Sequence, residues 1–268
     1  MKTLALAVVC AGAAIITGCA AELGDEAITE EGSAAITRGQ SDFTHTGVGA
    51  MVATNPSTGE KQAVCSGTLI APDVFLTAGH CVYFTQLYGF GPPVWVTFDQ
   101  HVTASSTLIP AEMHAPEGYV TNAIYDAQDI GVLVLSQPQR DRPLARLPSA
   151  GRLDTVLAHG TPLTVVGYGS ASIGPGQQFA ATNERRSGTV TVNSLVPEFV
   201  IVSELGVHGN DGECHGDSGG PMFASIGGVE TLVAIVTAGD GACHAQGFAK
   251  RTDTASTRTF LDDYVTLR

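Results

Sequence analysis

The stretch Cys214-His215-Gly216-Asp217-Ser218-Gly219-Gly220-Pro221 places one serine among several glycines. Because glycine has no side chain, the backbone here can approach another group closely and can turn the N–H groups of Gly216 and Ser218 toward one point. Such a pair of donors suits the negatively charged oxygen that develops during acyl transfer. Ser218 is therefore a candidate nucleophile, and it needs a histidine base and a carboxylate that orients this base.

Two other segments supply these partners, and together with Ser218 they follow the order His, Asp, Ser. Leu76–Cys81 places His80 directly after an apolar run that is typical of a buried strand. Asp126–Leu135 places Asp129 at the start of a second apolar run. An aspartate in that position can fix the tautomer of His80 and stabilise its imidazolium, while His80 takes the proton of Ser218.

Two other interpretations of the serine stretch stay open on these residues alone. Clusters of glycine, serine and aspartate are often plain loops without a catalytic role. Gly-Asp-Ser-Gly-Gly also fits the G-x-S-x-G turn of the α/β-hydrolases, which needs an aspartate and a histidine later in the chain. Asp240 and His244 do follow Ser218, but no alternation of strands and helices surrounds them. We therefore favour Ser218 as the nucleophile of a set with His80 and Asp129.

Composition and patterning predict an all-β protein. Hydrophobic residues make up 44% of the 268 residues, charged residues only 15%, and 32 residues are glycine, which indicates short strands and many turns. Short apolar runs recur between residues 47 and 136, with no helical period between them, and again between 163 and 236. This spacing predicts an antiparallel barrel or sandwich. The net charge of −13 argues against a nucleic-acid partner, because a phosphate backbone needs a basic face.

The end of the chain changes to a helical period. One helix face would hold Phe260, Leu261, Tyr264, Val265 and Arg268. We therefore expect a single closing helix over about 256–268, capped at its start by Ser256 or Thr257.

The first residues predict export from the cytoplasm. A lysine precedes an apolar run from Leu4 to Ile16 that is short for a membrane span. Ile16-Thr17-Gly18-Cys19-Ala20 resembles the lipobox of bacterial lipoproteins, which implies a signal over residues 1–19, lipid on Cys19 and attachment to the outer membrane. Ordinary secretion is the alternative. Residues 20–35 are small and acidic, without an apolar period, and read as a tether or a removable pro-segment.

Outside the signal the chain has four cysteines, Cys65, Cys81, Cys214 and Cys243. In an exported protein we expect them to be oxidised, and four cysteines allow three pairings. No C-x-x-C spacing occurs, which argues against a zinc site. The acids between residues 98 and 117 do not form a calcium-loop pattern, so we expect neither a metal nor a cofactor.

Taken together, these segments resemble the chymotrypsin/trypsin family of serine proteases. Gly216–Pro221 matches the family's serine motif residue for residue, and Asp129–Leu133 resembles its aspartate segment. Cys65–Ile70 followed by Val74–Cys81 resembles its histidine segment. The similarity runs from about Ile36 to the C-terminal helix, and three spaced motifs in the same order are far more specific than one.

The resemblance implies a fold and a disulfide pairing. The expected fold has two antiparallel six-stranded β-barrels and a C-terminal α-helix, with the first barrel over about 36–140 and the second over about 150–255. The expected disulfides are Cys65–Cys81 and Cys214–Cys243.

The resemblance also implies a serine endopeptidase, which hydrolyses a protein or peptide substrate through an acyl-enzyme. His80 would be the general base, Asp129 its orienting partner and Ser218 the nucleophile. The N–H groups of Gly216 and Ser218 would form the oxyanion hole. A protease homologue that binds without catalysis is the alternative from another class, although such proteins usually lose a residue of the triad.

In this family a new N-terminal ammonium group inserts beside the aspartate that precedes the serine, which is Asp217 here. The matching N-terminus is Ile36, so we expect activation by cleavage at Ala35–Ile36. Thr37 and Arg38 depart from the family's pattern, in which an apolar residue and a glycine follow. The alternative is that Asp217 only caps a turn.

Alignment to the serine motif places Gly212 and Glu213 at the base of the specificity pocket, with Asp211 nearby and Gly239 and Gly247 in its walls. Gly212 stands where trypsin-like enzymes carry an aspartate. Glu213, or Asp211 after a loop shift, is expected to supply the negative charge instead and to pair with a substrate Arg or Lys. The alternative is a neutral pocket with Glu213 turned to solvent.

Overall fold

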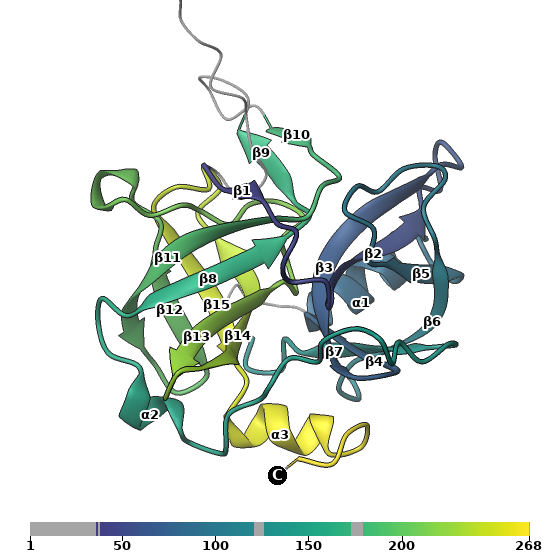
Figure 1. Ribbon diagram of the computed structural model, residues 1–268. Coiled ribbons are helices and arrows are strands. Elements are labelled where there is room, and N and C mark those ends of the chain that lie inside the picture. Colours follow the sequence, from purple (N-terminus) through teal and green to yellow (C-terminus); the bar gives the residue numbers. More distant parts are fainter. Residues whose placement is uncertain (1–35, 37, 121–125, 173–178, 268) are drawn as a thin grey trace, which may run out of the picture. The chain divides into compact units, whose positions relative to one another are not determined.

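The computed structural model describes residue 36 and residues 38–120, 126–172 and 179–267 (Figure 1). The chain divides into two compact units, residues 1–31 and 32–268, and every described residue belongs to the second. The expected signal, Cys19 and the acidic tether lie outside the described residues.

The first barrel closes on itself in the order β2-β3-β4-β7-β6-β5, and each neighbouring pair is antiparallel. Its strands are short apolar runs such as VFLT in β4 and GVLVL in β7, which suit a pleated and buried surface. The strands are β2 (Val48–Thr54), β3 (Lys61–Ala71), β4 (Val74–Thr77), β5 (Val94–Thr97), β6 (Ile109–His114) and β7 (Gly131–Leu135).

The second barrel also has six antiparallel strands, and pairing of β11 with β8 closes the ring. A short hairpin of β9 (Ser170–Ser172) and β10 (Phe179–Ala181) extends from it. The strands are β8 (Pro162–Gly167), β11 (Arg186–Leu195), β12 (Phe199–Ser203), β13 (Pro221–Ile226), β14 (Val229–Gly239) and β15 (Gln246–Arg251). Figure 1 shows the two barrels as separate groups of strands, which confirms the predicted fold class.

The start of the described chain belongs to the second barrel. Strand β1 (Gln40–Ser41) pairs with β11, with Gln40 opposite Ser187. Ile36 is fully buried in the apolar cluster of the second barrel. The first barrel therefore begins later than the expected residue 36, because this segment crosses to the other barrel before β2.

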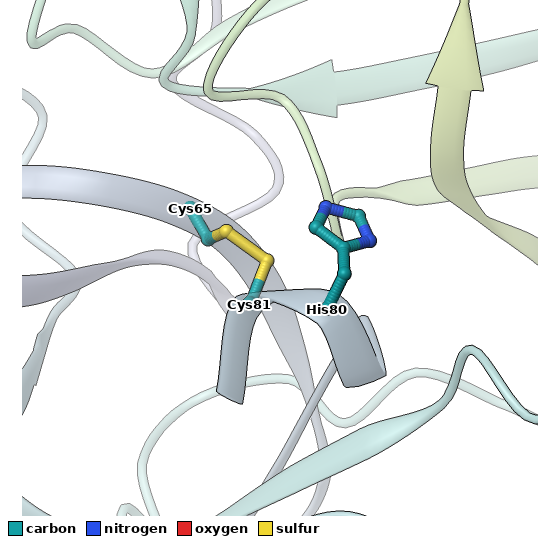
Figure 2. Close-up of side chains that lie close together, drawn as sticks. All are labelled: Cys65, His80 and Cys81. Carbon is teal, nitrogen blue, oxygen red and sulfur yellow. A yellow bond between two sulfur atoms is a disulfide. The ribbon is translucent and has the colours of Figure 1, made fainter. Parts of the chain in front are cut away.

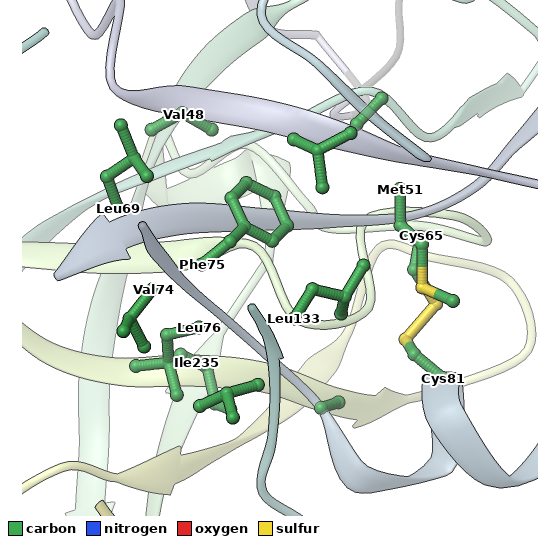
Figure 3. Close-up of a cluster of buried hydrophobic side chains, with 14 of the residues drawn as sticks. Val48, Met51, Cys65, Leu69, Val74, Phe75, Leu76, Cys81, Leu133 and Ile235 are labelled. Carbon is green, nitrogen blue, oxygen red and sulfur yellow. A yellow bond between two sulfur atoms is a disulfide. The ribbon is translucent and has the colours of Figure 1, made fainter. Parts of the chain in front are cut away.

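One apolar cluster joins the two barrels. In the first barrel Phe75 packs edge to face against Phe98, with ring centroids 5.9 Å apart. The same cluster contains Ile235 of β14 and Leu261 near the C-terminus (Figure 3 shows part of it). Burial of apolar side chains across this contact holds the barrels together, and residues contributed by both barrels can therefore meet at a defined site.

The closing helix is shorter than predicted and begins one residue earlier. Helix α3 spans Ala255–Leu261 rather than 256–268, and Thr254 caps it by accepting a hydrogen bond from the Thr257 N–H. The expectation of Ser256 or Thr257 as the cap was wrong, because the Thr257 hydroxyl donates to the Arg251 carbonyl instead. The predicted apolar residues do face the core, because Leu261 belongs to the apolar cluster and Tyr264 and Val265, which follow the helix, pack against it.

Helix α1 (Gly79–Leu87) was not expected, because no helical period was recognised between residues 47 and 136. Its apolar residues are spread around the helix rather than gathered on one face, and Ala78 at its N-cap supplies no side-chain hydrogen bond. Neither of the usual sequence signals of a helix is therefore present. Two further short helices are α2 (Leu153–Val156) and the 3₁₀ turn η1 (Gly206–His208).

Candidate active site

His80 lies in the first turn of α1 and faces Asp129, which lies just before β7. The backbone N–H of His80 donates to Asp129 Oδ1 over 2.8 Å, and His80 Nδ1 lies 2.9 Å from Oδ2. The Tyr119 hydroxyl also donates to Oδ1, over 3.1 Å. Because the buried carboxylate accepts the Nδ1 proton, it holds the ring in the tautomer whose Nε2 can act as a base.

Glycine at position 79 makes this approach of the two segments possible. A Cβ atom on Gly79 would lie 2.9 Å from the Ile130 carbonyl oxygen and 3.0 Å from the Ile130 nitrogen. The start of α1 thus packs directly on the backbone next to Asp129. A larger residue would push His80 away from its carboxylate.

The serine loop is fastened to the first barrel at two points. The backbone N–H of Ser66 donates to the Ser218 carbonyl over 2.8 Å, and the Ser66 hydroxyl donates to the Gly216 carbonyl over 2.9 Å. Gly216 has φ +96° and Gly219 has φ +78°, in the left-handed region that favours glycine. These backbone angles explain why the loop needs glycine at both positions, one before and one after Ser218.

The N–H groups of Gly216 and Ser218 have no hydrogen-bond acceptor among the residues that the structure describes. The carbonyl groups of the same residues are occupied by the Ser66 contacts, so the loop is held while its donors stay available. Two available backbone donors next to a serine are the arrangement that can receive a developing oxyanion.

Ser218 and His80 line the same cleft, which has a volume of about 510 Å³ and also contains Gly216. The Cys65–Cys81 disulfide forms part of its floor and joins β3 to the first turn of α1, next to His80 (Figure 2). The three sequence-predicted residues therefore come together from both barrels. Ser218 comes from the loop before β13, and the His80–Asp129 pair comes from the first barrel.

Asp217 is fully buried behind the serine loop. Its Oδ1 accepts the Gly169 N–H and its Oδ2 accepts the Cys214 N–H, each over 2.9 Å. The backbone N–H of Ile36 also bonds to this carboxyl group, so the structure brings the two predicted activation residues together. Burial raises the pKa of Asp217 to about 7, and the three N–H donors offset only part of that rise.

A second pocket of about 220 Å³, which we call the primary pocket, opens beside Ser218 and is lined by Glu213, Val236 and Gly239 among others. Glu213 is buried, and neither of its carboxyl oxygens has a hydrogen-bond partner among the described residues. Glu204, at the end of β12, is also fully buried, and its Oε1 accepts the Glu213 N–H over 3.2 Å. The primary pocket thus lies in front of two adjacent acidic side chains.

Comparison with known proteins agrees with this arrangement. Residues 36–258 match the family described as Trypsin. The chain belongs to the trypsin family.

The relatives of this chain are named as proteases in some cases and as an inhibitor in another. Trypsin from Saccharopolyspora erythraea is 30% identical over 69% of this chain and 79% of its own length. Chymotrypsin from Phaedon cochleariae is 31% identical over 62% of this chain and 61% of its own length. Glucanase inhibitor protein 1 from Phytophthora sojae is 29% identical over 64% of this chain and 65% of its own length. Because one of these names describes an inhibitor, membership of the trypsin family does not by itself establish proteolysis.

Both disulfides expected from the resemblance to this family are present, Cys65–Cys81 and Cys214–Cys243. Each bridge lies close to a histidine, His80 in one case and His215 in the other, and such groups of sulfur and nitrogen atoms resemble metal sites. Metal binding by cysteine requires a thiolate, and the sulfur atoms of both groups are joined in disulfides. We therefore interpret these clusters as structural bridges.

The pocket departs from the trypsin pattern and from two sequence-based expectations. Asp211 does not supply its charge, because its Oδ2 accepts the Thr189 N–H over 2.7 Å and it does not line the primary pocket. Glu213 is not turned to solvent, since it is only 3% exposed. Gly212 is buried next to Glu213. Gly247 faces both acids, because a Cβ atom there would lie 2.5 Å from Glu213 Oε1 and 2.6 Å from Glu204 Oε1.

Burial sets the protonation of the two acids. Burial, with repulsion from Asp240 and Asp217, raises the pKa of Glu204 to about 8. Burial, with repulsion from Glu204 and Asp217, raises the pKa of Glu213 well above its ordinary value, although the Phe248 N–H lies close enough to offset part of this rise. Glu204 therefore holds a proton at neutral pH when no cation is near, and the buried position of Glu213 disfavours a second negative charge beside it.

Sequence reasoning missed Glu204 and the role of Arg38. Arg38 has φ +68°, a left-handed conformation that glycine adopts without strain, and the sequence resemblance had led us to expect glycine at this position. Its guanidinium donates to the main-chain oxygens of Asn210 and Glu204, over 2.7 Å and 3.0 Å for Nη2. An acid directly after an apolar strand, as at Glu204, was the one available signal of a functional residue.

Trypsin-family domains with disulfides are typical of secreted or extracellular proteins, which agrees with the predicted export. Within the described part of the chain, no helix combines the length and apolar character that a membrane crossing needs.

Proposed function

We propose that the protein is a serine endopeptidase. The observation that carries this proposal is the pairing of His80 with Asp129 through both the backbone and the ring, in a cleft shared with Ser218. A purely structural role would not require a histidine to be oriented by a carboxylate in a cleft that also holds a serine, with the N–H groups of Gly216 and Ser218 lacking an acceptor in the described part of the chain.

The reaction would proceed in two similar halves. His80 Nε2 takes the hydroxyl proton of Ser218 as its oxygen bonds to the substrate carbonyl carbon, and the N–H groups of Gly216 and Ser218 stabilise the resulting oxyanion. The protonated His80 then gives this proton to the leaving amine as the C–N bond breaks. Water attacks the acyl-enzyme with the same base and donors, which restores Ser218 and releases the acid.

Activation by cleavage at Ala35–Ile36 is part of the proposal. Asp217 already contacts the Ile36 nitrogen, and no cationic side chain among the described residues pairs with this buried carboxyl group. A new ammonium at Ile36 would supply the missing charge and lower the cost of ionising Asp217. N-terminal sequencing of active protein tests this proposal, and a start at another residue would refute it.

Cleavage after basic residues is the specificity that the primary pocket favours. Glu213 faces the space beside Ser218 and has no cationic partner among the residues that the structure describes, so a substrate Arg or Lys is its natural counterpart. Peptides that differ only at the residue before the scissile bond test this specificity. Turnover of Leu or Phe peptides equal to that of Arg peptides would exclude it.

Export with lipid on Cys19 is proposed from the sequence, with secretion as the alternative. Labelling with a palmitate analogue, compared between the natural chain and a Cys19→Ala variant, tests this proposal. Incorporation that is unchanged in the variant would contradict attachment through Cys19.

A binding protein without catalysis is the second candidate, and the similarity to a glucanase inhibitor protein favours it. An uncharged organophosphonate, which reacts with an activated serine, separates the two functions. We expect covalent labelling of protein cleaved before Ile36 and no labelling of the Ser218→Ala variant. Absence of labelling and of peptide hydrolysis in the cleaved natural protein would support the binding function instead.

A further inference from the structure

The two buried acids behind the primary pocket take no part in the triad, yet they lie where a substrate side chain would enter. We propose that Glu213 binds the cationic side chain of a substrate, that Glu204 behind it shares the charge, and that the pair releases a proton as the cation enters. This inference rests on the proposed function and adds Glu204 as a positioning residue for specificity.

Glu213 is the member of the pair that can touch a ligand. It lines the primary pocket together with Ser218 and Gly239, and so a side chain held next to the nucleophile would point toward its carboxyl group. The side chain is buried, and among the described residues no side chain hydrogen-bonds to its carboxyl group, although the Phe248 N–H lies nearby. A buried polar group of this kind is costly unless a ligand satisfies it.

Glu204 lies directly behind Glu213. Its Oε1 accepts the Glu213 N–H, while its Oε2 has no hydrogen-bond partner in the described part of the chain. One oxygen of each acid lies within 2.6 Å of the same point, the position that a Cβ atom on Gly247 would take. Glycine at this position therefore leaves room for the two carboxyl groups to lie side by side.

The charges that face the pair do not neutralise it. Asp217 and Asp240 both add negative potential at Glu204 and at Glu213. Arg38 attracts Glu204, but its guanidinium is hydrogen-bonded to main-chain oxygens rather than to a carboxyl group. The raised pKa values of the pair follow from this surplus of acids, and a cation from outside is the charge that the site lacks.

Proton release follows from the same electrostatics. A cation beside Glu213 favours the ionised carboxylate, so a proton that the pair holds at neutral pH must leave to solvent as the cation enters. Protons and the cation thus compete for one site, and affinity rises with pH. The planar fork of an arginine would suit two neighbouring carboxyl groups better than the point charge of a lysine.

Binding of benzamidinium, a small amidinium cation, tests the site without requiring catalysis. The measurement is calorimetric titration of the full-length Ser218→Ala chain from pH 5.5 to 8.5, in two buffers that differ in ionisation enthalpy. We expect affinity to rise about tenfold per pH unit below pH 7.5, with release of about one proton per cation bound. Flat affinity across this range, or no binding at any of these pH values, would overturn the proposal.

Two substitutions assign the roles, and one serves as a control. Glu213→Gln is expected to weaken binding by about 30-fold or more, because the contacting charge is lost. Glu204→Gln keeps the acceptor for the Glu213 N–H, and it is expected to shift the pH profile about one unit lower and to reduce proton release at pH 7 by half or more. Glu112→Gln removes an equal charge from an exposed side chain and should change neither quantity.

The Glu204→Gln result separates a role in proton holding from a structural role. A variant that only loosened the pocket would bind more weakly with the same pH profile and the same proton release, and this outcome would refute the assignment of Glu204. Organophosphonate labelling of Ser218 reports on the triad alone, so failure of the pocket and failure of the proposed protease function give different results.

Discussion

At the scale of single residues, Asp129 performs two tasks with two oxygen atoms. Oδ1 accepts the backbone N–H of His80 and the Tyr119 hydroxyl, which anchors the start of α1. Oδ2 faces the imidazole ring and sets its tautomer. Anchoring of α1 needs an acceptor only at Oδ1, whereas the tautomer of His80 needs an acceptor at Oδ2 as well. A mutation that changes only the second atom therefore separates the two tasks.

Asp129→Asn is expected to lower kcat by about 10⁴-fold with little loss of thermal stability. The amide keeps an acceptor for the His80 backbone, but its NH₂ group would face Nδ1 and favour the opposite tautomer. Turnover of a peptide ester and thermal unfolding are the measurements, and Asp126→Asn is the matched control in the preceding turn. A loss of less than tenfold in kcat would contradict the orienting role.

At the scale of elements, the segment from Ile36 to β1 connects the proposed cleavage point with the primary pocket. Ile36 bonds to Asp217, and Arg38 bonds to the main chain of Glu204 and Asn210. Arg38 thus fastens the turn that follows β12, which carries one of the two acids. Its hydrogen bonds offset the cost of a left-handed backbone at a residue with a side chain.

Arg38→Ala is expected to lower the free energy of unfolding by about 1–3 kcal/mol, because two main-chain oxygens lose charged donors while the strained φ remains. Arg38→Gly should cost about 1 kcal/mol less, since glycine adopts φ +68° without strain. Urea unfolding of both variants measures the difference. Equal stability of the two variants would show that the backbone conformation carries no cost here.

The sequence predicts a feature of these elements well when its signal lies in consecutive residues, and poorly when the feature depends on contacts made only in the folded protein. The β-barrels follow from strand patterns, and the pairing of His80 with Asp129 follows from two short motifs, because both kinds of signal are visible in consecutive residues. Helix α1 and the Thr254 cap were missed, since α1 lacks an apolar face and a side-chain cap. Glu204 could not be placed beside Glu213, because β12 and the serine loop meet only in the folded barrel.

At the scale of the whole molecule, a buried arginine helps to join the barrels. Arg185, just before β11, donates hydrogen bonds to the carbonyls of Val48 and Phe98 in the first barrel and to the Tyr168 hydroxyl in the second. It is only 3% exposed. The polar contact therefore fixes the orientation of the barrels, while the shared apolar cluster supplies most of the attraction.

Arg185→Met is expected to lower the free energy of unfolding by about 2–4 kcal/mol, because several buried acceptors lose their donor. Denaturant unfolding followed by the fluorescence of Trp95, the single tryptophan, is the measurement. Arg140→Met, at an exposed position, is the control. A change below 0.5 kcal/mol, on the order of an ordinary surface substitution, would contradict this role.

The uncleaved chain is expected to become less stable as pH rises from about 4.5 to 8. The pKa of Asp217 is raised to about 7 and that of Glu204 to about 8, whereas both groups ionise near their ordinary values when unfolded. In this range the folded state binds more protons than the unfolded state, so the free energy of unfolding falls with pH. Urea unfolding of the Ser218→Ala chain at several pH values tests this, with Glu204→Gln expected to flatten the slope.

The pairing of β1 with β11 has a consequence for the order in which the protein is made. The residues after Ile36 are synthesised first, but their partner strand belongs to the barrel that leaves the ribosome last. Such long-range pairing forms late, because the intervening chain must fold before the two ends can meet. Until the second barrel has folded, Ile36 therefore lacks both its Asp217 partner and the apolar cluster that buries it.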